Sequence, residues 1–117
     1  MATVALGAPT TINLCYTRGD SRGIVFTVRD ENGAALDVSS NTFQLVVNSE
    51  EDSDDTGNVV QFTLSHTFVT DGTDGQIRFA PTTTESNIVA ETYFYDMRQL
   101  TPTVHTLATG TFQILTR

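Results

Sequence analysis

The sequence has no tryptophan, no lysine, a single cysteine and three prolines. The one cysteine, Cys15, cannot form an internal disulfide and leaves no second thiol for a metal site. No apolar run reaches the roughly 18 residues of a membrane-spanning helix, so we expect no membrane segment. The first residues, MATVALGAPTT, lack the basic flank and the long apolar stretch of a secretion signal. We therefore expect the protein to be made and folded in a cytoplasm.

Positive charge is also scarce. The chain carries 14 acidic and six basic residues, which gives a formal net charge of −8. Nucleic-acid binding needs clustered positive charge that displaces counterions from phosphate, so we expect no nucleic-acid partner. The basic residues are all arginine: Arg18, Arg22, Arg29, Arg78, Arg98 and Arg117.

Strand signals dominate the 117 residues, of which 38% are hydrophobic and 21 are threonine. Apolar residues come in short alternating clusters, which is typical of half-buried strands, and β-branched side chains favour the pleated backbone. The segments with this pattern are 11–16, 23–30, 42–48, 58–69, 75–81, 91–100 and 104–117. About seven strands with almost no helix predict an all-β fold, an immunoglobulin-like antiparallel β-sandwich.

The segments between these strands carry turn signals. Asn32-Gly33 and the doubled Asp-Gly of 70–75 favour tight reversals. Pro81 ends a strand, and 82–91 is the one place where a single helical turn is expected, capped by Thr83 or Thr84. Gly110 predicts a bulge or bend in the last strand.

The expected domain organisation is simple. A flexible N-terminal arm covers residues 1–10, and one β-sandwich domain covers 11–117. The arm is uncharged and carries Val4, Leu6 and Pro9, which we identify as a candidate contact with a partner protein.

Four runs of sequence occur in order along most of the chain. They are RGDSRGIVFTVRDENGAALDVSS (18–40), GQIRFAPTTTES (75–86), ETYFYDMRQL (91–100) and HTLATGTFQIL (105–115). In this order they resemble the small immunoglobulin-like modules of tailed-bacteriophage structural proteins, including the N-terminal domain of phage baseplate upper proteins. The resemblance implies a structural role in the virion, with other virion proteins as partners.

The first of these runs contains the tripeptide Arg18-Gly19-Asp20, a sequence known as a cell-adhesion signal. Gly19 permits a backbone conformation closed to other residues, and it lies where one strand turns into the next. We therefore interpret the tripeptide as a structural turn in which Arg18 and Asp20 bridge each other or cap local N–H groups. Integrin binding would require the turn to project from a protein that meets animal cells.

The run 91–100 has two distinct faces. Tyr93 and Tyr95 share one face with Met97, and both tyrosines are placed like residues that pin the corner of an immunoglobulin-like sandwich through a hydroxyl-to-backbone bond. The opposite face carries Phe94, Asp96 and Arg98.

No pattern for catalysis, a cofactor or a metal emerges. His66 and His105 lie in strand-like segments as expected solvent-facing residues, without a nucleophile motif. Cys15 alternates with Leu14 and Tyr16, so we expect it in packing or at an interface. The acidic run 50–55 lacks the spacing of a calcium loop and is interpreted as a solvated loop.

The sequence thus predicts a non-enzymatic virion protein that docks onto other virion proteins. A homo-oligomer on the virion is also compatible with this prediction. Capsid decoration, on the major capsid protein, is slightly favoured by the small size and acidic surface. A tail or baseplate module is the alternative. A receptor- or carbohydrate-binding module would need an exposed aromatic platform, and tryptophan, the usual choice, is absent.

Overall fold

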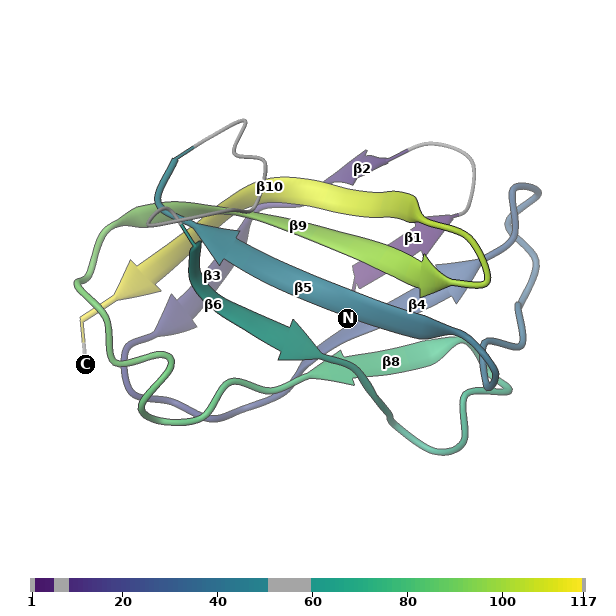
Figure 1. Ribbon diagram of the computed structural model, residues 1–117, viewed down its shortest axis with the longest axis horizontal. Coiled ribbons are helices and arrows are strands. Elements are labelled where there is room, and N and C mark those ends of the chain that lie inside the picture. Colours follow the sequence, from purple (N-terminus) through teal and green to yellow (C-terminus); the bar gives the residue numbers. More distant parts are fainter. Residues whose placement is uncertain (1, 6–8, 51–59, 117) are drawn as a thin grey trace.

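The computed structural model describes residues 2–5, 9–50 and 60–116, which contain ten strands and no helix. The strands follow the alternating segments of the sequence (Figure 1). They are β1 Ala2–Ala5, β2 Thr10–Thr11, β3 Leu14–Thr17, β4 Ile24–Arg29, β5 Thr42–Asn48, β6 Val60–Ser65, β7 Thr67–Phe68, β8 Gln76–Phe79, β9 Thr92–Thr101 and β10 His105–Leu115.

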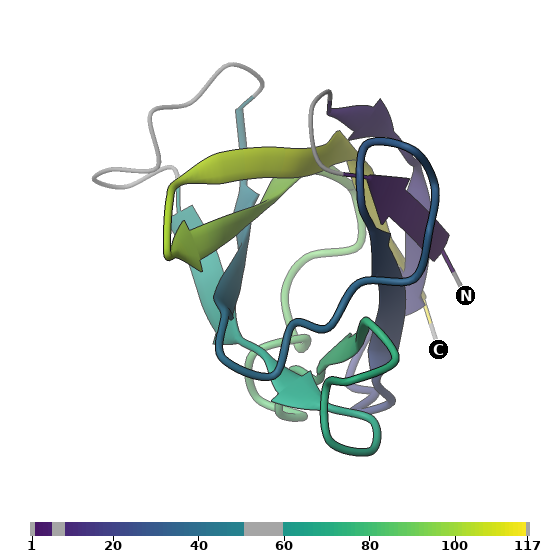
Figure 2. The same cartoon turned by 90° about the vertical axis from the view of Figure 1, so that its right-hand side faces the viewer.

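The strands form two sheets that enclose a common core, as the end-on view in Figure 2 shows. One sheet has the order β1-β4-β8-β7. The other has the order β2-β10-β9-β5-β6, with β3 also paired to β10. The predicted all-β sandwich is confirmed, but both sheets are mixed, because β1 runs parallel to β4 and both β2 and β3 run parallel to β10.

Ten strands replace the expected seven for two local reasons. The segment 58–69 was expected as one strand, but it divides at His66 into β6 and β7, which belong to different sheets. The start of the chain adds β1 and β2, where a flexible arm was expected. Alternation alone cannot show that a strand changes sheets, since the inward face stays apolar on both sides of the change.

The core lies between the sheets and follows the predicted alternation. Along β9, Tyr93, Tyr95 and Met97 are buried, while the residues between them are half-buried on the outer face. The Tyr93 hydroxyl donates to the Val89 carbonyl at 2.7 Å, and the Tyr95 hydroxyl donates to the Ile12 carbonyl at 2.8 Å. The predicted pinning of the corner by tyrosine hydroxyls is confirmed.

Strand β1 completes one edge of its sheet. Its register places Val4 beside Val28 of β4, and the Val4 side chain is only 1% exposed. Burying a valine stabilises a fold by about 1.5–3 kcal/mol, and β1 also pairs backbone groups of β4 that would otherwise lie at an open edge. Residues 2–5 therefore belong to the sandwich rather than to a loose arm.

The segment after Pro81 forms one turn. Thr82 and Glu85 bond reciprocally: the Glu85 N–H donates to Thr82 Oγ1 at 3.1 Å, and the Thr82 N–H donates to Glu85 Oε1 at 2.8 Å. The Ser86 N–H closes the turn on the Thr82 carbonyl at 3.1 Å. The expected single turn exists, but the prediction of Thr83 or Thr84 as cap is wrong, because the three-residue spacing to Glu85 selects Thr82.

Candidate functional site

The Arg-Gly-Asp tripeptide forms the turn between β3 and β4. Gly19 has a φ of 82°, which favours glycine. The Arg18 N–H donates to the Leu115 carbonyl at 2.9 Å, and the Asp20 N–H donates to the Thr17 carbonyl at 3.1 Å. The backbone of the turn is therefore bonded both to itself and to the end of β10.

The side chains of the turn are engaged with the segment after β8. Arg18 Nε donates to Asn87 Oδ1 at 3.0 Å, and the Ser86 hydroxyl donates to the Asp20 carbonyl at 2.6 Å. The Asp20 carboxylate lies 3.9 Å from Arg22 Nε. Arg18 and Asp20 thus contact other residues rather than each other, and the adhesion-like tripeptide packs along the body of the protein.

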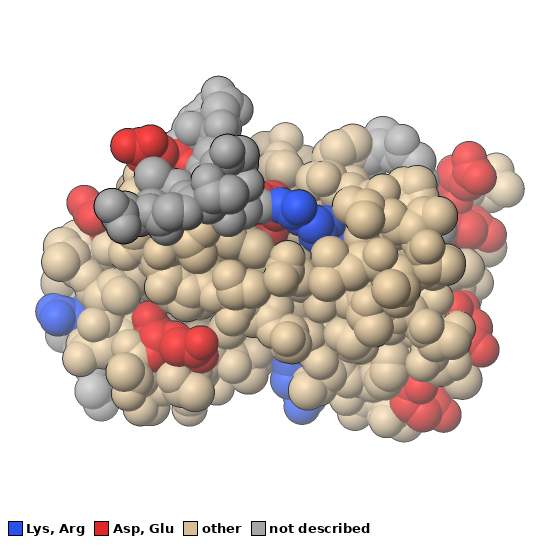
Figure 3. All heavy atoms as spheres, viewed as in Figure 1, with Lys and Arg blue, Asp and Glu red and all other residues tan. Residues whose placement is uncertain are grey.

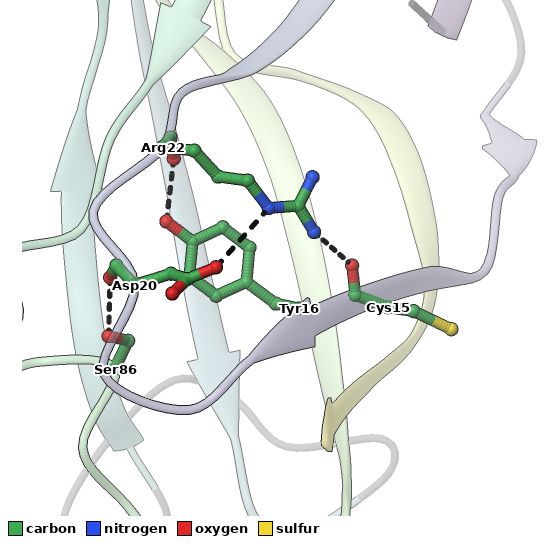
Figure 4. Close-up of polar contacts among 5 residues, drawn as sticks. All are labelled: Cys15, Tyr16, Asp20, Arg22 and Ser86. Atoms are coloured by element: carbon green, nitrogen blue, oxygen red, sulfur yellow. Dashed lines mark hydrogen bonds and ion pairs between the residues drawn. The ribbon is translucent and has the colours of Figure 1, made fainter. Parts of the chain in front are cut away.

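Tyr16, before this turn, and Arg22, after it, contact each other and so link its two ends (Figure 4). The Tyr16 hydroxyl donates to the Arg22 carbonyl at 2.6 Å, and Arg22 Nη2 donates to the Cys15 carbonyl at 2.9 Å. The guanidinium carbon lies 4.7 Å from the centre of the Tyr16 ring, within the range of a cation–π contact. Burial raises the pKa of Tyr16 to about 12, with Arg22 opposing and Asp20 adding to the shift, so the hydroxyl stays a donor at neutral pH.

The remaining candidate residues do not come together. His66 is half-buried between the rings of Phe43 and Phe68, and its Nδ1 accepts the Phe43 N–H at 3.2 Å, so the expectation of a solvent-facing residue is wrong. His105 and Cys15 are both exposed, so the expected packing of Cys15 is also wrong within this chain.

The described part of the chain contains no cluster of metal-binding side chains. No group of three or more histidine, cysteine, aspartate or glutamate residues there could hold a metal ion. Of the acidic run 50–55, only Glu50 lies within the described residues. Within the same residues, no helix is long and apolar enough to span a membrane.

Pro9 and Val4 of the predicted partner contact have different environments. Pro9 is exposed, whereas Val4 is part of the core. The core position of Val4 leaves it unavailable to a partner while β1 stays paired. Leu6 lies outside the described residues.

A groove of about 590 Å³ lies on the outer face of the sheet that contains β5, β9 and β10. Strand register arranges the outward residues of these strands in three rows across the face. The rows are Asn48–Phe94–Thr111, Val46–Asp96–Thr109 and Gln44–Arg98–Thr106. Thr11 and Asn13, from the segment beside β10, and Glu50, just after β5, also line the groove.

Asp96 and Arg98 form an ion pair at the centre of the groove. Arg98 donates to Asp96 Oδ1 from Nη2 at 2.9 Å and from Nε at 3.2 Å. The Arg98 side chain is 29% exposed and the Asp96 side chain is 18% exposed. Burial raises the pKa of Asp96. The ion pair is therefore partly desolvated, unlike the exposed Asp20–Arg22 pair at the turn.

Gly110 allows the segment of Ile12 and Asn13 to lie close to β10 beside the groove. The Ile12 N–H donates to the Thr109 carbonyl at 2.9 Å, and the Thr111 N–H donates to Asn13 Oδ1 at 3.1 Å. A Cβ atom on Gly110 would lie 2.2 Å from the Ile12 carbonyl oxygen. The residue therefore permits a close backbone approach, whereas the irregularity expected at Gly110 falls between Thr106 and Ala108.

Two carboxylates, Glu50 and Asp96, line this groove, and others lie elsewhere on the same face. The face in Figure 3 is that of β5 and β9, and its carboxylates concentrate toward the ends of the molecule. Asp37, between β4 and β5, and Asp71, between β7 and β8, each lie in a loop with other carboxylates, and the two interact electrostatically. Around the centre of the face, basic side chains lie beside the grey atoms and are surrounded by mostly uncharged residues (Figure 3).

Comparison with known proteins gives a likeness of fold. No protein-family model matches the chain, and no curated protein matches it in sequence. Among solved structures, the chain is similar to the N-terminal domain of phage TP901-1 ORF48, with a TM-score of 0.56 and 13% sequence identity. The match covers 96% of this chain and 93% of that domain. The resemblance to a phage module, expected from the four sequence runs, is confirmed in the fold.

Proposed function

We propose that this protein is a non-enzymatic structural module of a bacteriophage tail or baseplate, which docks onto other virion proteins. The observation that carries the proposal is the likeness in fold to a domain of a phage protein, over 96% of this chain and 93% of that domain. A fold can host many functions, so the four ordered sequence runs supply the second support.

Tail or baseplate placement is preferred to capsid decoration. The sequence runs resemble a baseplate module, and the solved structure that the chain matches is also a phage domain. No comparison supports decoration of the capsid. The slight preference for decoration that size and charge favoured is therefore withdrawn.

The docking surface is proposed to lie outside the Arg-Gly-Asp turn. The polar groups of that turn bond to Asn87, Ser86 and Leu115 of the same chain, so docking there would require these bonds to break. Pro9 is exposed and remains a proposed contact. The net charge of −8 suits a partner with arginine or lysine on its surface.

Quantitative mass spectrometry of purified virions tests the proposal. We expect the chain to be present at a copy number close to that of the tail-ring proteins and far below that of the major capsid protein. Labelling with gold-coupled antibody should mark the tail end of the particle. Capsid-like copy number with label over the head would instead support decoration, and absence from purified particles would refute a virion role.

A further inference from the structure

The groove between β5, β9 and β10 has no role in the docking proposed above. Its side chains are mostly hydroxyl and amide groups, with one half-buried aromatic ring, Phe94, at the middle of its row. A volume of about 590 Å³ is in the range of sites for small molecules. The chemistry of the lining narrows what such a molecule can be.

Charge argues against an anionic ligand, and the available donors argue against a metal ion. The guanidinium of Arg98 is bonded to Asp96, and Glu50 adds a second carboxylate at the rim, so an anion would meet a net negative site. A metal ion would need several clustered donors of suitable type, and the described residues contain no such group. An apolar ligand would leave the hydroxyls, the amides and the ion pair desolvated without partners. A neutral polar ligand avoids all three costs.

Backbone pairing argues against an extended peptide. A peptide commonly binds a sheet by adding to an edge, where N–H and C=O groups are unpaired. The groove instead lies over β9 and β10, which are paired on both sides by β5 and by β2 and β3. The aromatic residues in its described lining are Phe94 and Tyr95, and Tyr95 is buried in the core, so the lining does not offer a series of apolar pockets for peptide side chains.

We propose that this groove binds a neutral saccharide. The ring of Phe94 supplies a surface against which the apolar C–H face of a sugar packs. Thr111 beside it and Thr109 in the next row supply hydroxyls, which both donate and accept hydrogen bonds. The Asp96 carboxylate, held in place by its two bonds from Arg98, presents an acceptor in a fixed position for a sugar hydroxyl.

Titration of the ¹⁵N-labelled protein, followed by NMR, tests this. The probes are maltotriose, cellotriose and tri-N-acetylchitotriose, up to about 20 mM, where millimolar dissociation constants are measurable. Glycerol at matched concentration controls for non-specific effects of hydroxyl groups. We expect at least one trisaccharide to shift amide signals at Phe94, Asp96, Thr109 and Thr111. No shifts with any of the three, or shifts confined to other parts of the molecule, would overturn the proposal.

Two variants test whether the groove itself binds. Phe94→Ala removes the packing surface and should weaken binding by about tenfold or more, as truncation of a central aromatic does. Thr111→Val keeps the shape and removes one hydroxyl, so it serves if Phe94→Ala is poorly folded. Thr63→Val is the control, because Thr63 is exposed on β6 of the same sheet and does not line the groove. If Thr111→Val and a folded Phe94→Ala both bind the saccharide with unchanged affinity, the groove is not the binding site. This outcome does not depend on whether the chain is found in virions.

Discussion

At the residue scale, a few hydroxyls and one glycine determine how the strands are joined. Tyr16, Tyr93 and Tyr95 each donate to a backbone carbonyl from a ring that is otherwise in the core. An apolar ring with one polar end satisfies a carbonyl that would be costly to bury alone. Gly19 supplies the backbone angle that lets the chain reverse between β3 and β4.

Replacement of Gly19 by valine should destabilise the protein by about 1–3 kcal/mol, because a β-branched residue is strained at a φ of 82°. Thermal unfolding measures this. Asp20→Glu is the control and should be mild, since the Ser86 hydroxyl bonds to the backbone carbonyl of Asp20 and not to its side chain. A Gly19→Val protein that unfolds with the wild type but loses adhesion to integrin-bearing cells would reverse the structural interpretation of the tripeptide.

Asp37 and Asp71 should make stability fall in acid. Asp37 Oδ1 accepts bonds from the Ser39 hydroxyl and N–H, and Asp71 Oδ1 accepts them from the Thr73 hydroxyl and N–H. These bonds lower the pKa of both carboxyls below 3.8 in the folded protein. A depressed folded pKa contributes stability that is present above the unfolded pKa and is lost as pH falls through the folded value.

The measurement is the free energy of unfolding by urea across the acid range. Asp37→Asn with Asp71→Asn should lower stability at neutral pH and reduce its decline below about pH 4. The control is Asp96→Asn, since burial raises the pKa of Asp96 and its contribution has the opposite sign. An acid decline equal in the double variant and the wild type would exclude these turns as its source.

At the element scale, β1 makes residues 2–5 part of a sheet rather than a loose arm. A stretch that looks unstructured by composition pairs with β4 through all four of its residues, from Ala2 beside Phe26 to Ala5 beside Arg29. The Val4 side chain points inward and packs in the core. Short edge strands of this kind protect the sheet from pairing with other chains.

Val4→Ala should therefore lower the free energy of unfolding by roughly 1–3 kcal/mol, through lost apolar burial and the space left behind. Urea unfolding followed by circular dichroism measures it. Thr3→Ala is the matched control, because Thr3 is exposed on the same strand and should change stability by less than about 0.5 kcal/mol. Equal stability of the two variants would mean that β1 is not held in the sheet in solution.

At the scale of the whole molecule, charge separates the ends from the middle of the outer face. Carboxylates gather toward the ends of the sandwich (Figure 3), while the charged residues in the described lining of the groove are Glu50, Asp96 and Arg98. This division suits two kinds of contact on one small domain. We expect long-range attraction to a basic partner at the ends and short-range hydrogen bonding to a saccharide in the groove.

Attachment to tail or baseplate assemblies should weaken as salt rises. Between about 0.05 and 0.5 M ionic strength the screening length shortens about threefold, which reduces attraction between the acidic ends and a basic partner. Co-sedimentation of the purified protein with assemblies that lack it measures this. Saccharide binding in the groove should be nearly independent of salt in the same range, which provides an internal control. Attachment that stays constant with salt would point to an apolar interface instead.

Much of this fold could be predicted from local pattern. Alternation located the main strands, and the two faces of 91–100 separated Tyr93 and Tyr95 in the core from Phe94, Asp96 and Arg98 outside it. The turn at Gly19 followed from the conformational freedom of glycine. These features depend on side chains close together in sequence, so the sequence by itself determined them.

Only the tertiary structure decided which distant segments meet. The groove exists because β5, β9 and β10 align in register and Gly110 lets the segment of Ile12 cross closely, at a separation of about a hundred residues along the chain. Val4 is a core residue because β1 pairs with the edge of β4, and His66 is half-buried because it lies where β6 and β7 divide between the two sheets. Periodicity reports which side of a strand is apolar, whereas the choice of neighbouring strand depends on packing over the whole core.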